Sequence, residues 1–227
     1  MHRQRCRLAG HRTASDPRRI RVKDDDGYVL FHTPYTPGSF GPPGGVFKLR
    51  IPAQAALDRI GFREERRGTR QSVTYADLRG FVSSRRLGAF LRWFGDSADR
   101  ESARDCLRRE IFEELGEVGL PHLRTMVASL SFTLVRAVTE APRTVPGRSY
   151  RQFRHIEVYE LGRSAAEDRF RRALLRTARS GETPGVVLST SSEIISGRCR
   201  AVLVGPQSAY LFGVRRVRED LPPAAAQ

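Results

Sequence analysis

Four glutamates, Glu110, Glu113, Glu114 and Glu117, crowd together in a chain whose formal net charge is +15. On a helix, residues three and four positions apart are neighbours, so each like-charge pair costs about a few tenths of a kcal/mol. Along such a helix, Arg109 is placed to pair with Glu113, whereas the other acids lack a cation at helical spacing. Clustered carboxylate oxygens are the hard ligands that Mg²⁺ and Mn²⁺ prefer, and these ions usually bind phosphates as well. The cluster therefore indicates a divalent-metal site that acts on phosphates.

The residues around these acids predict a helix. Ser102 can cap its N-terminus with Asp105 three residues later, and Gly116 is placed to end it. At about 100° per residue, one apolar stripe is formed by Leu107, Ile111, Leu115 and Val118. Glu110 and Glu114 border that stripe, so we expect them where the helix meets the rest of the fold.

The run from Gly95 to Gly116 resembles the Nudix box, G-x5-E-x7-R-E-U-x-E-E-x-G-U, in which U is an apolar residue. Ile111 fills the first apolar position. All the fixed positions of the box are present, as Gly95, Glu101, Arg109, Glu110, Glu113, Glu114 and Gly116. The sequence departs from the pattern at the last apolar position, where Glu117 stands and Val118 follows.

The resemblance to Nudix hydrolases implies an α/β fold, an α/β/α sandwich with a mixed β-sheet. It also implies Mg²⁺-dependent (or Mn²⁺-dependent) hydrolysis of a pyrophosphate bond in a nucleoside diphosphate-linked substrate. By the same resemblance Glu110, Glu113 and Glu114 are catalytic metal ligands, and one of them is a candidate general base. Arg109 would hold Glu113 or a neighbouring acid in place, and Glu101 would pin the start of the helix or join the metal shell. Metal ions at such a site neutralise the diphosphate and lower the pKa of a bound water.

Many Nudix proteins carry a Pro-Gly-Gly turn that runs directly into the box. Here Pro43-Gly44-Gly45 lies about fifty residues upstream of Gly95. Either the intervening residues are an insertion or the early turn is unrelated to the box. The arrangement, with FGPPGGVFK early and DLRGF and FLRWFGDSADRE before the box, is similar to the SMODS-associated Nudix group of bacterial nucleotide-signalling defence systems. This similarity implies a role in antiviral nucleotide signalling.

Composition along the chain predicts the domain organisation. Residues 1–24 are basic and poor in large apolar residues, which predicts a flexible arm. Residues 25–216 are expected to form a single Nudix domain, with a large segment, 46–94, before the box and a flexible tail at 217–227. Residues 86–94 fit a short helix or a strand. Strands are expected at 27–33, 46–51, 122–138 (one or two), 151–161 and 185–190, and helices at 164–181 and 191–198.

A cluster of arginine and aromatic side chains precedes the strand expected at 151–161. Arg151, Phe153 and Arg154 could bind a nucleobase and phosphates. A sheet edge rimmed by charge is the alternative. Nudix enzymes often add one acid from outside the box, and the sequence does not choose among Glu157, Glu160 and Glu193.

The basic composition, with a pI near 11.0, attracts nucleic acid, nucleotides or anionic membranes, although the arginines are scattered along the chain. Cys6, Cys106 and Cys199 form no CxxC pair, which suits a reducing cytosol. No secretory signal and no apolar stretch of membrane-spanning length is found. We therefore expect a cytoplasmic protein without a membrane partner.

Three functions compete at this point. The first is a Mg²⁺-dependent Nudix hydrolase that acts on a nucleotide or dinucleotide. The second is a Nudix module that senses a nucleotide without cleaving it, motivated by the distant Gly-Gly turn, Glu117 and the large segment before the box. The third, ranked last, is an RNA-processing or RNA-binding protein, motivated by the high pI. Family analogy leaves a homodimer open.

Overall fold

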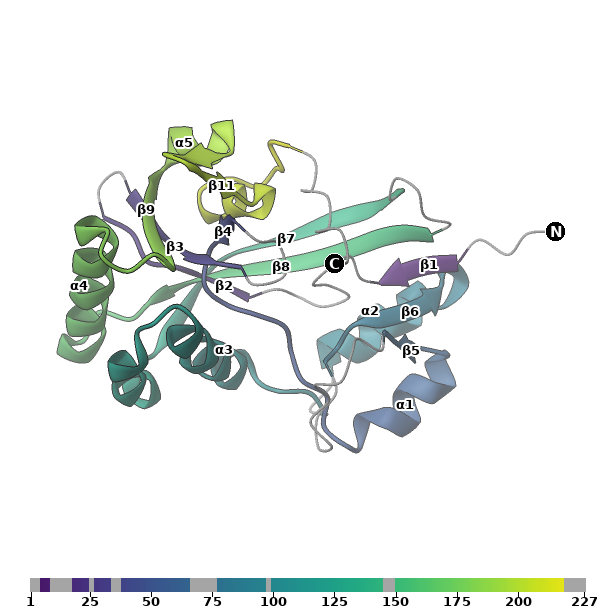
Figure 1. Cartoon of the computed structure of the whole chain (residues 1–227). Helices are drawn as coiled ribbons and strands as arrows, with labels where there is room; N and C mark the ends of the chain where they lie inside the picture. The colour runs from purple at the N-terminus through teal and green to yellow at the C-terminus, as the bar shows by residue number, and fades with distance from the viewer. Residues whose placement is uncertain are drawn as a thin grey trace. The chain divides into compact units, whose positions relative to one another are not determined.

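The computed structural model (Figure 1) describes residues 5–8, 18–24, 27–33, 38–65, 77–96, 99–144 and 150–218. The chain divides into two compact units, each assembled from separate stretches of sequence. Unit 1 contains residues 1–18, 45–106 and 137–157, and unit 2 contains residues 19–44, 107–136 and 158–227. The segments that run from one unit into the other include α3 (Ala103–Glu117), β7 (Phe132–Thr144) and β8 (Tyr150–Leu161).

Unit 1 contains a mixed sheet with helices packed beside it. Strand β1 pairs parallel with β8 and antiparallel with β6, and β6 pairs antiparallel with β5. Helix α2 contacts both α1 and β6, and the ring of Phe90 on α2 stacks on Phe62. The elements are β1 (Arg5–Leu8), α1 (Ala53–Ile60), β5 (Arg63–Glu64), β6 (Gly80–Ser83), the 3-10 helix η1 (Ser84–Arg86) and α2 (Leu87–Asp96). Residues 86–94, left open between helix and strand, are thus helical.

Unit 2 contains a second mixed sheet, with strand order β10-β11-β4-β3-β9. Only the β11–β4 pairing within it is parallel. Helix α4 contacts β9 and β3, and α5 contacts η3 (Figure 1). The elements are β2 (Arg18–Arg21), β3 (Gly27–His32), β4 (Ser39–Gly41), η2 (Pro121–Ser129), α4 (Ala165–Ser180), β9 (Val186–Thr190), α5 (Ser191–Ser196), β10 (Arg198–Cys199), β11 (Val202–Val204) and η3 (Pro206–Leu211). No helix in the described ranges is both long and apolar enough to cross a bilayer.

Two parts of the predicted N-terminal arm are strands. Arg5–Leu8 forms β1, and Arg18–Arg21 forms β2, which pairs with β8. Ile20 and Val22 are each only 1% exposed. The prediction of a flexible arm is wrong for β2, because the alternating β-branched residues Ile20 and Val22 bury this segment despite its arginines. The rest of the predicted arm to residue 17, and residues 219–227 of the predicted tail, lie outside the described residues.

The prediction of a strand over residues 46–51 is also wrong. Lys48 makes an isolated bridge to Asp77, and Leu49 makes one to Arg100. Phe47 and Leu49 are buried, whereas Arg50 is exposed. The alternation in the sequence corresponds to alternating burial only over residues 47–50, and no continuous partner strand runs beside this segment in the described part of unit 1.

Residues 121–129 are a 3-10 helix, where the sequence was expected to form a strand from residue 122. Pro121 starts this helix, at a position where its missing N–H costs no hydrogen bond. Leu123 and Val127 are the buried residues of this helix. The strand prediction holds only from Phe132, where β7 begins.

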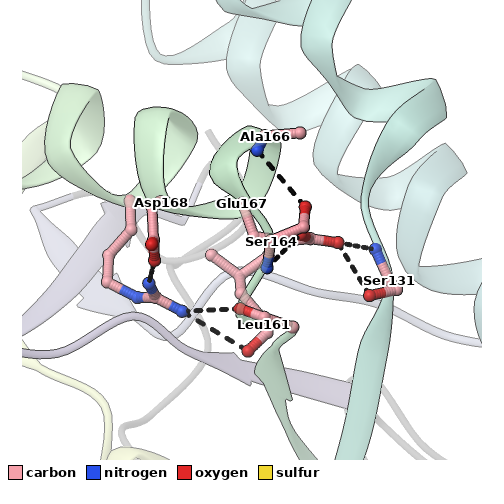
Figure 2. A network of polar contacts seen from close by, with 8 residues as sticks. Ser131, Leu161, Ser164, Ala166, Glu167 and Asp168 are labelled. Atoms are coloured by element: carbon pink, nitrogen blue, oxygen red, sulfur yellow. Dashed lines mark hydrogen bonds and ion pairs between the residues drawn. The ribbon is translucent and has the colours of Figure 1, made fainter.

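Helix α4 begins as the sequence predicts (Figure 2). Ser164 and Glu167 form a capping box, and Gly181 ends the helix with a left-handed backbone. The Glu167 carboxylate also accepts hydrogen bonds of 2.8 Å from the Ser131 amide and 2.7 Å from its hydroxyl group. The hydroxyl groups of Ser164 and Ser131 together lower the pKa of Glu167 to about 2. This buried carboxylate thus joins α4 to the start of β7.

We expect Glu167→Gln to lower the free energy of unfolding by about 1–3 kcal/mol at pH 7, because two hydroxyl groups and two amides lose a charged acceptor. A carboxyl group whose pKa falls on folding stabilises the protein above its unfolded pKa of about 4.5 and stops doing so as the pH drops through about 2. The difference between variant and wild type, measured by urea unfolding, should therefore shrink between these pH values. Glu182→Gln, at an exposed position, is the control and should change little. A pH-independent difference for Glu167→Gln would contradict the assignment.

Candidate functional site

Helix α3 places the clustered acids at the border of its buried face. Its apolar stripe is buried as predicted, through Leu107, Ile111, Leu115 and Val118. Glu110 and Glu114 are half-buried, while Glu113 has 48% of its side chain exposed. Glu117, where the sequence leaves the box pattern, is exposed. Ser102 caps the helix as expected, accepting a 3.1 Å hydrogen bond from the Asp105 amide.

Arg109 holds two of these acids. Its Nη1 lies 2.6 Å from Oε1 of Glu110 and 3.5 Å from Oε2 of Glu113. The sequence suggested Glu113 as the only helical partner, because residues one apart do not face each other on a helix. The long arginine side chain nevertheless folds back to its immediate neighbour. Arg109 therefore restrains Glu110 more closely than Glu113.

Glu114 is held by the Pro-Gly-Gly turn. The Gly44 amide donates a hydrogen bond of 2.8 Å to Oε2 of Glu114. Gly44 has a φ of 128°, which a residue with a side chain adopts only with strain. The turn thus meets the box helix in space although the two are distant in sequence. Of the two interpretations left open by the sequence, this contact favours an insertion between the turn and the box.

A buried arginine fixes the turn itself. Nη1 of Arg19 donates to the carbonyl oxygens of Pro42 at 3.0 Å and of Gly44 at 3.3 Å. The neighbouring Ile20 amide donates to the Pro43 carbonyl at 2.9 Å. These bonds direct the three carbonyl groups toward β2. Arg19 lies in the segment that was predicted to be a flexible arm, so its role was not predicted; the alternation of Ile20 with Val22 is the signal in the sequence that indicates a buried strand here.

The C-terminal end of α3 differs from the prediction. The left-handed residue is Gly119, with a φ of 85°, and Leu120 donates to the Leu115 carbonyl at 2.7 Å. This pattern is a Schellman motif. Gly116, which the sequence suggested as the end, has another use: a Cβ atom there would lie 1.8 Å from the guanidinium of Arg124. That guanidinium donates to the Phe112 carbonyl at 2.7 Å.

Glu101, the remaining box acid, lies in the stretch of unit 1 that precedes α3. Its Oε2 accepts a 3.1 Å hydrogen bond from the Lys48 amide, and its own amide donates to the Lys48 carbonyl at 3.0 Å. Glu101 therefore pins the residues before the helix to the segment around Lys48. The resemblance implied that Glu101 either pins the start of the helix or joins the metal shell. These hydrogen bonds fit the first of these two roles.

The predicted substrate-binding cluster is mostly buried. Phe153 is 6% exposed and belongs to the core of unit 1, so its ring is not available to stack on a nucleobase. Arg154 is 7% exposed and lies 3.6 Å from Glu140. Arg151 is exposed and donates to the Pro142 carbonyl. Phe153 and Arg154 follow each other along β8, so they lie on opposite faces of the strand and both are buried there. Their burial argues against direct contact with a nucleotide, and the substrate-binding assignment of the cluster stays a prediction.

The three candidate acids outside the box have different environments. Glu193 completes the capping box of α5 with Thr190, so it has a structural role. Glu157, in unit 1, lies 3.8 Å from the imidazole of His155. Glu160, in unit 2, forms an ion pair with Arg21. None of these contacts alone identifies a further metal ligand.

The donor chemistry of α3 fits a hard divalent cation, since three carboxylates lie within two helical turns. In the described ranges, however, no three His, Cys, Asp or Glu side chains are grouped closely enough to hold a metal ion. Glu110 and Glu113 face Arg109, and Glu114 faces Gly44. A cation that binds here would therefore compete with these contacts for the carboxylates.

The turn-to-helix contact can be tested by hydrogen exchange. In Glu114→Ala the Gly44 amide loses its acceptor, so we expect it to exchange at least about tenfold faster, equivalent to about 1.4 kcal/mol of lost protection. Exchange would be followed residue by residue by NMR. Glu117→Ala, one turn along on the exposed side of α3, is the matched control and should leave that amide unchanged. Equal exchange in both variants would contradict the contact.

Comparison with known families agrees with this architecture. The model of the SMODS-associated NUDIX domain matches residues 18–212, which include β2, the turn at residues 42–45 and the box helix. Neither the curated proteins nor the solved structures gave a match. The helices and two mixed sheets are those of an α/β Nudix fold. The chain therefore belongs to the family of SMODS-associated NUDIX domains.

Proposed function

We propose that this protein is a divalent-metal-dependent hydrolase that cleaves a pyrophosphate bond in a nucleotide or dinucleotide. The observation that carries the proposal is the arrangement of three box carboxylates on one edge of α3, with Arg109 and the Gly44 amide as partners. Membership of the Nudix family supports the reaction class. The SMODS-associated group supports a place in bacterial nucleotide signalling, and we extend this to antiviral defence in the cytoplasm.

In this proposal Glu110, Glu113 and Glu114 would hold Mg²⁺ or Mn²⁺. Such a cation, when bound, neutralises phosphate charge and lowers the pKa of a coordinated water. The chain's own residues orient these ligands. Gly44 fixes one oxygen of Glu114, and Arg109 limits the rotation of Glu110. The half-buried position of Glu110 and Glu114 strengthens their electrostatic interaction with a cation relative to bulk water.

A second candidate, a nucleotide sensor that does not hydrolyse its ligand, is favoured by a specific observation. The contacts of Arg109 with Glu110 and Glu113 are those of a structural ion pair. If they persist when nucleotide binds, two of the three carboxylates stay in contact with a single arginine, which offsets one of their two charges. Recovery of intact nucleotide after tight binding in the presence of Mg²⁺ would support the sensor. RNA binding remains the third alternative, and a homodimer remains a prediction.

Single substitutions separate these functions. We expect Glu110→Gln, Glu113→Gln and Glu114→Gln each to reduce Mg²⁺-dependent turnover by about 100-fold or more, because each removes a negative charge from the metal ligands. Glu117→Gln makes the same charge change on the same helix at an exposed position outside the pattern, and it should stay within about twofold of wild type.

The assay would use a panel of nucleoside triphosphates, dinucleotides, nucleotide sugars and cyclic oligonucleotides, with product identification by mass spectrometry. Chelation of divalent metal should abolish turnover in wild type. Absence of metal-dependent turnover on every member of the panel, or an equal loss in Glu117→Gln and Glu114→Gln, would refute the hydrolase.

A further inference from the structure

A cavity of about 340 Å³ in unit 2 has a strongly charged lining. It lies among β2, the end of β8 and the first turns of α4. Its volume is in the lower part of the range for small-molecule sites. Apart from Leu161, the lining residues are all charged: Arg21, Lys23, Arg163 and Arg171 are cations, and Glu160 and Asp168 are acids. Such a lining suits an ionic group rather than a nucleobase, which needs apolar or aromatic surface.

Two of the four cations are fixed in the wall. Arg171 forms an ion pair with Asp168 and donates to the carbonyl oxygens of Gly162 at 2.9 Å and Leu161 at 3.4 Å. Figure 2 shows the contacts that reach Asp168 and Leu161. Arg21 forms an ion pair with Glu160 and donates to the Leu211 carbonyl at 3.3 Å. The two acids of the cavity are thus used to neutralise and orient these two arginines.

The other two cations, Lys23 and Arg163, carry the uncompensated charge. Both are exposed, and within the described ranges neither side chain forms a hydrogen bond or an ion pair. Four cations face two acids, which leaves the cavity with a net charge of +2.

We propose that this cavity is a binding site for a phosphate group, either as the free anion or as part of a nucleotide. Lys23 and Arg163 would contact the phosphate directly, because an ammonium group and a guanidinium fork are the side chains that form charge-assisted hydrogen bonds to it. Arg21 and Arg171 would shape the wall that receives it. Binding needs no metal and no hydrolysis, so this inference stands apart from the proposed function.

The cavity is also connected with the box helix through β2. Arg21 lies two residues after Arg19, and side chains two residues apart share one face of a strand. Their Cα atoms are about 7 Å apart at the rise of a strand. Arg19 holds the turn whose Gly44 amide contacts Glu114. A phosphate in the cavity would therefore bind beside the strand that positions a box carboxylate.

The experiment is calorimetry of the full chain with inorganic phosphate and with a nucleoside monophosphate, in chelator and at low salt. We expect the double variant Lys23→Gln/Arg163→Gln to bind both ligands about tenfold or more weakly, which corresponds to about 1.4 kcal/mol. The matched control is Arg172→Gln/Arg176→Gln. It removes the same two charges from exposed positions of α4 that do not line the cavity, and should stay within about twofold of wild type. Thermal melting would establish that both variants are folded.

The outcomes are decisive in either direction. Tighter binding of the monophosphate than of inorganic phosphate assigns the site to a nucleotide, and equal affinity assigns it to the free anion. The absence of saturable binding at millimolar ligand, or equal weakening in both double variants, would overturn the site. Glu114→Gln should bind phosphate like wild type whether or not it hydrolyses nucleotides. Failure of this site and failure of the hydrolase can therefore be told apart.

Discussion

The buried guanidinium of Arg19 is the constraint on which the geometry around the box depends. A charged group in the interior is costly unless it is hydrogen-bonded, and Nη1 of Arg19 meets this requirement at the carbonyl oxygens of Pro42 and Gly44, while its buried Nε has no hydrogen-bond partner among the described residues. The same bonds satisfy the turn, whose backbone would otherwise need other partners. With its carbonyls held toward β2, the turn presents the Gly44 amide to Glu114. The position of a box carboxylate thus depends on a residue far upstream in the sequence.

Charge on the box helix is balanced partly by Arg109 within the helix and partly from outside it. The last turn of α3 contains no basic residue, although four acids lie in its second half. The negative end of the helix dipole would add to their repulsion. Arg124, from the following 3-10 helix, supplies the missing positive charge: it binds the Phe112 carbonyl and lies 4.6 Å over the Phe112 ring. The absence of a side chain at Gly116 gives this guanidinium its place. Arg109 within the helix and Arg124 outside it therefore both place positive charge near the acids of α3.

Local signals in the sequence were sufficient for α4, α5, the start of α3 and the box, since capping residues and apolar periodicity act within one element. Helix α4 begins after Ser164 and ends before Gly181, as predicted. The failures have a common cause, which is that tertiary contacts decide between locally similar patterns. Residues 122–129 were expected to begin a strand but lie in a 3-10 helix that starts at Pro121, and Gly119 rather than the earlier glycine ends α3. At the site, Phe153 resembled a ligand-stacking residue because nothing local indicates which face of β8 is buried.

The chain leaves unit 2 just after Gly44 and re-enters it at Leu107, so that the stretch 45–106 belongs to unit 1. The contact between Gly44 and Glu114 closes a loop of 70 residues. The entropy lost on closing a flexible loop grows only with the logarithm of its length, about 0.6 kcal/mol for each doubling. Much of this stretch is itself folded into helices and strands of unit 1. The entropy cost calculated for a flexible loop is therefore an upper value for this one. The number of residues between turn and box is thus a weak thermodynamic constraint. Displacing a carbonyl group of the turn would lower the stability of the protein more than adding many residues between the turn and the box.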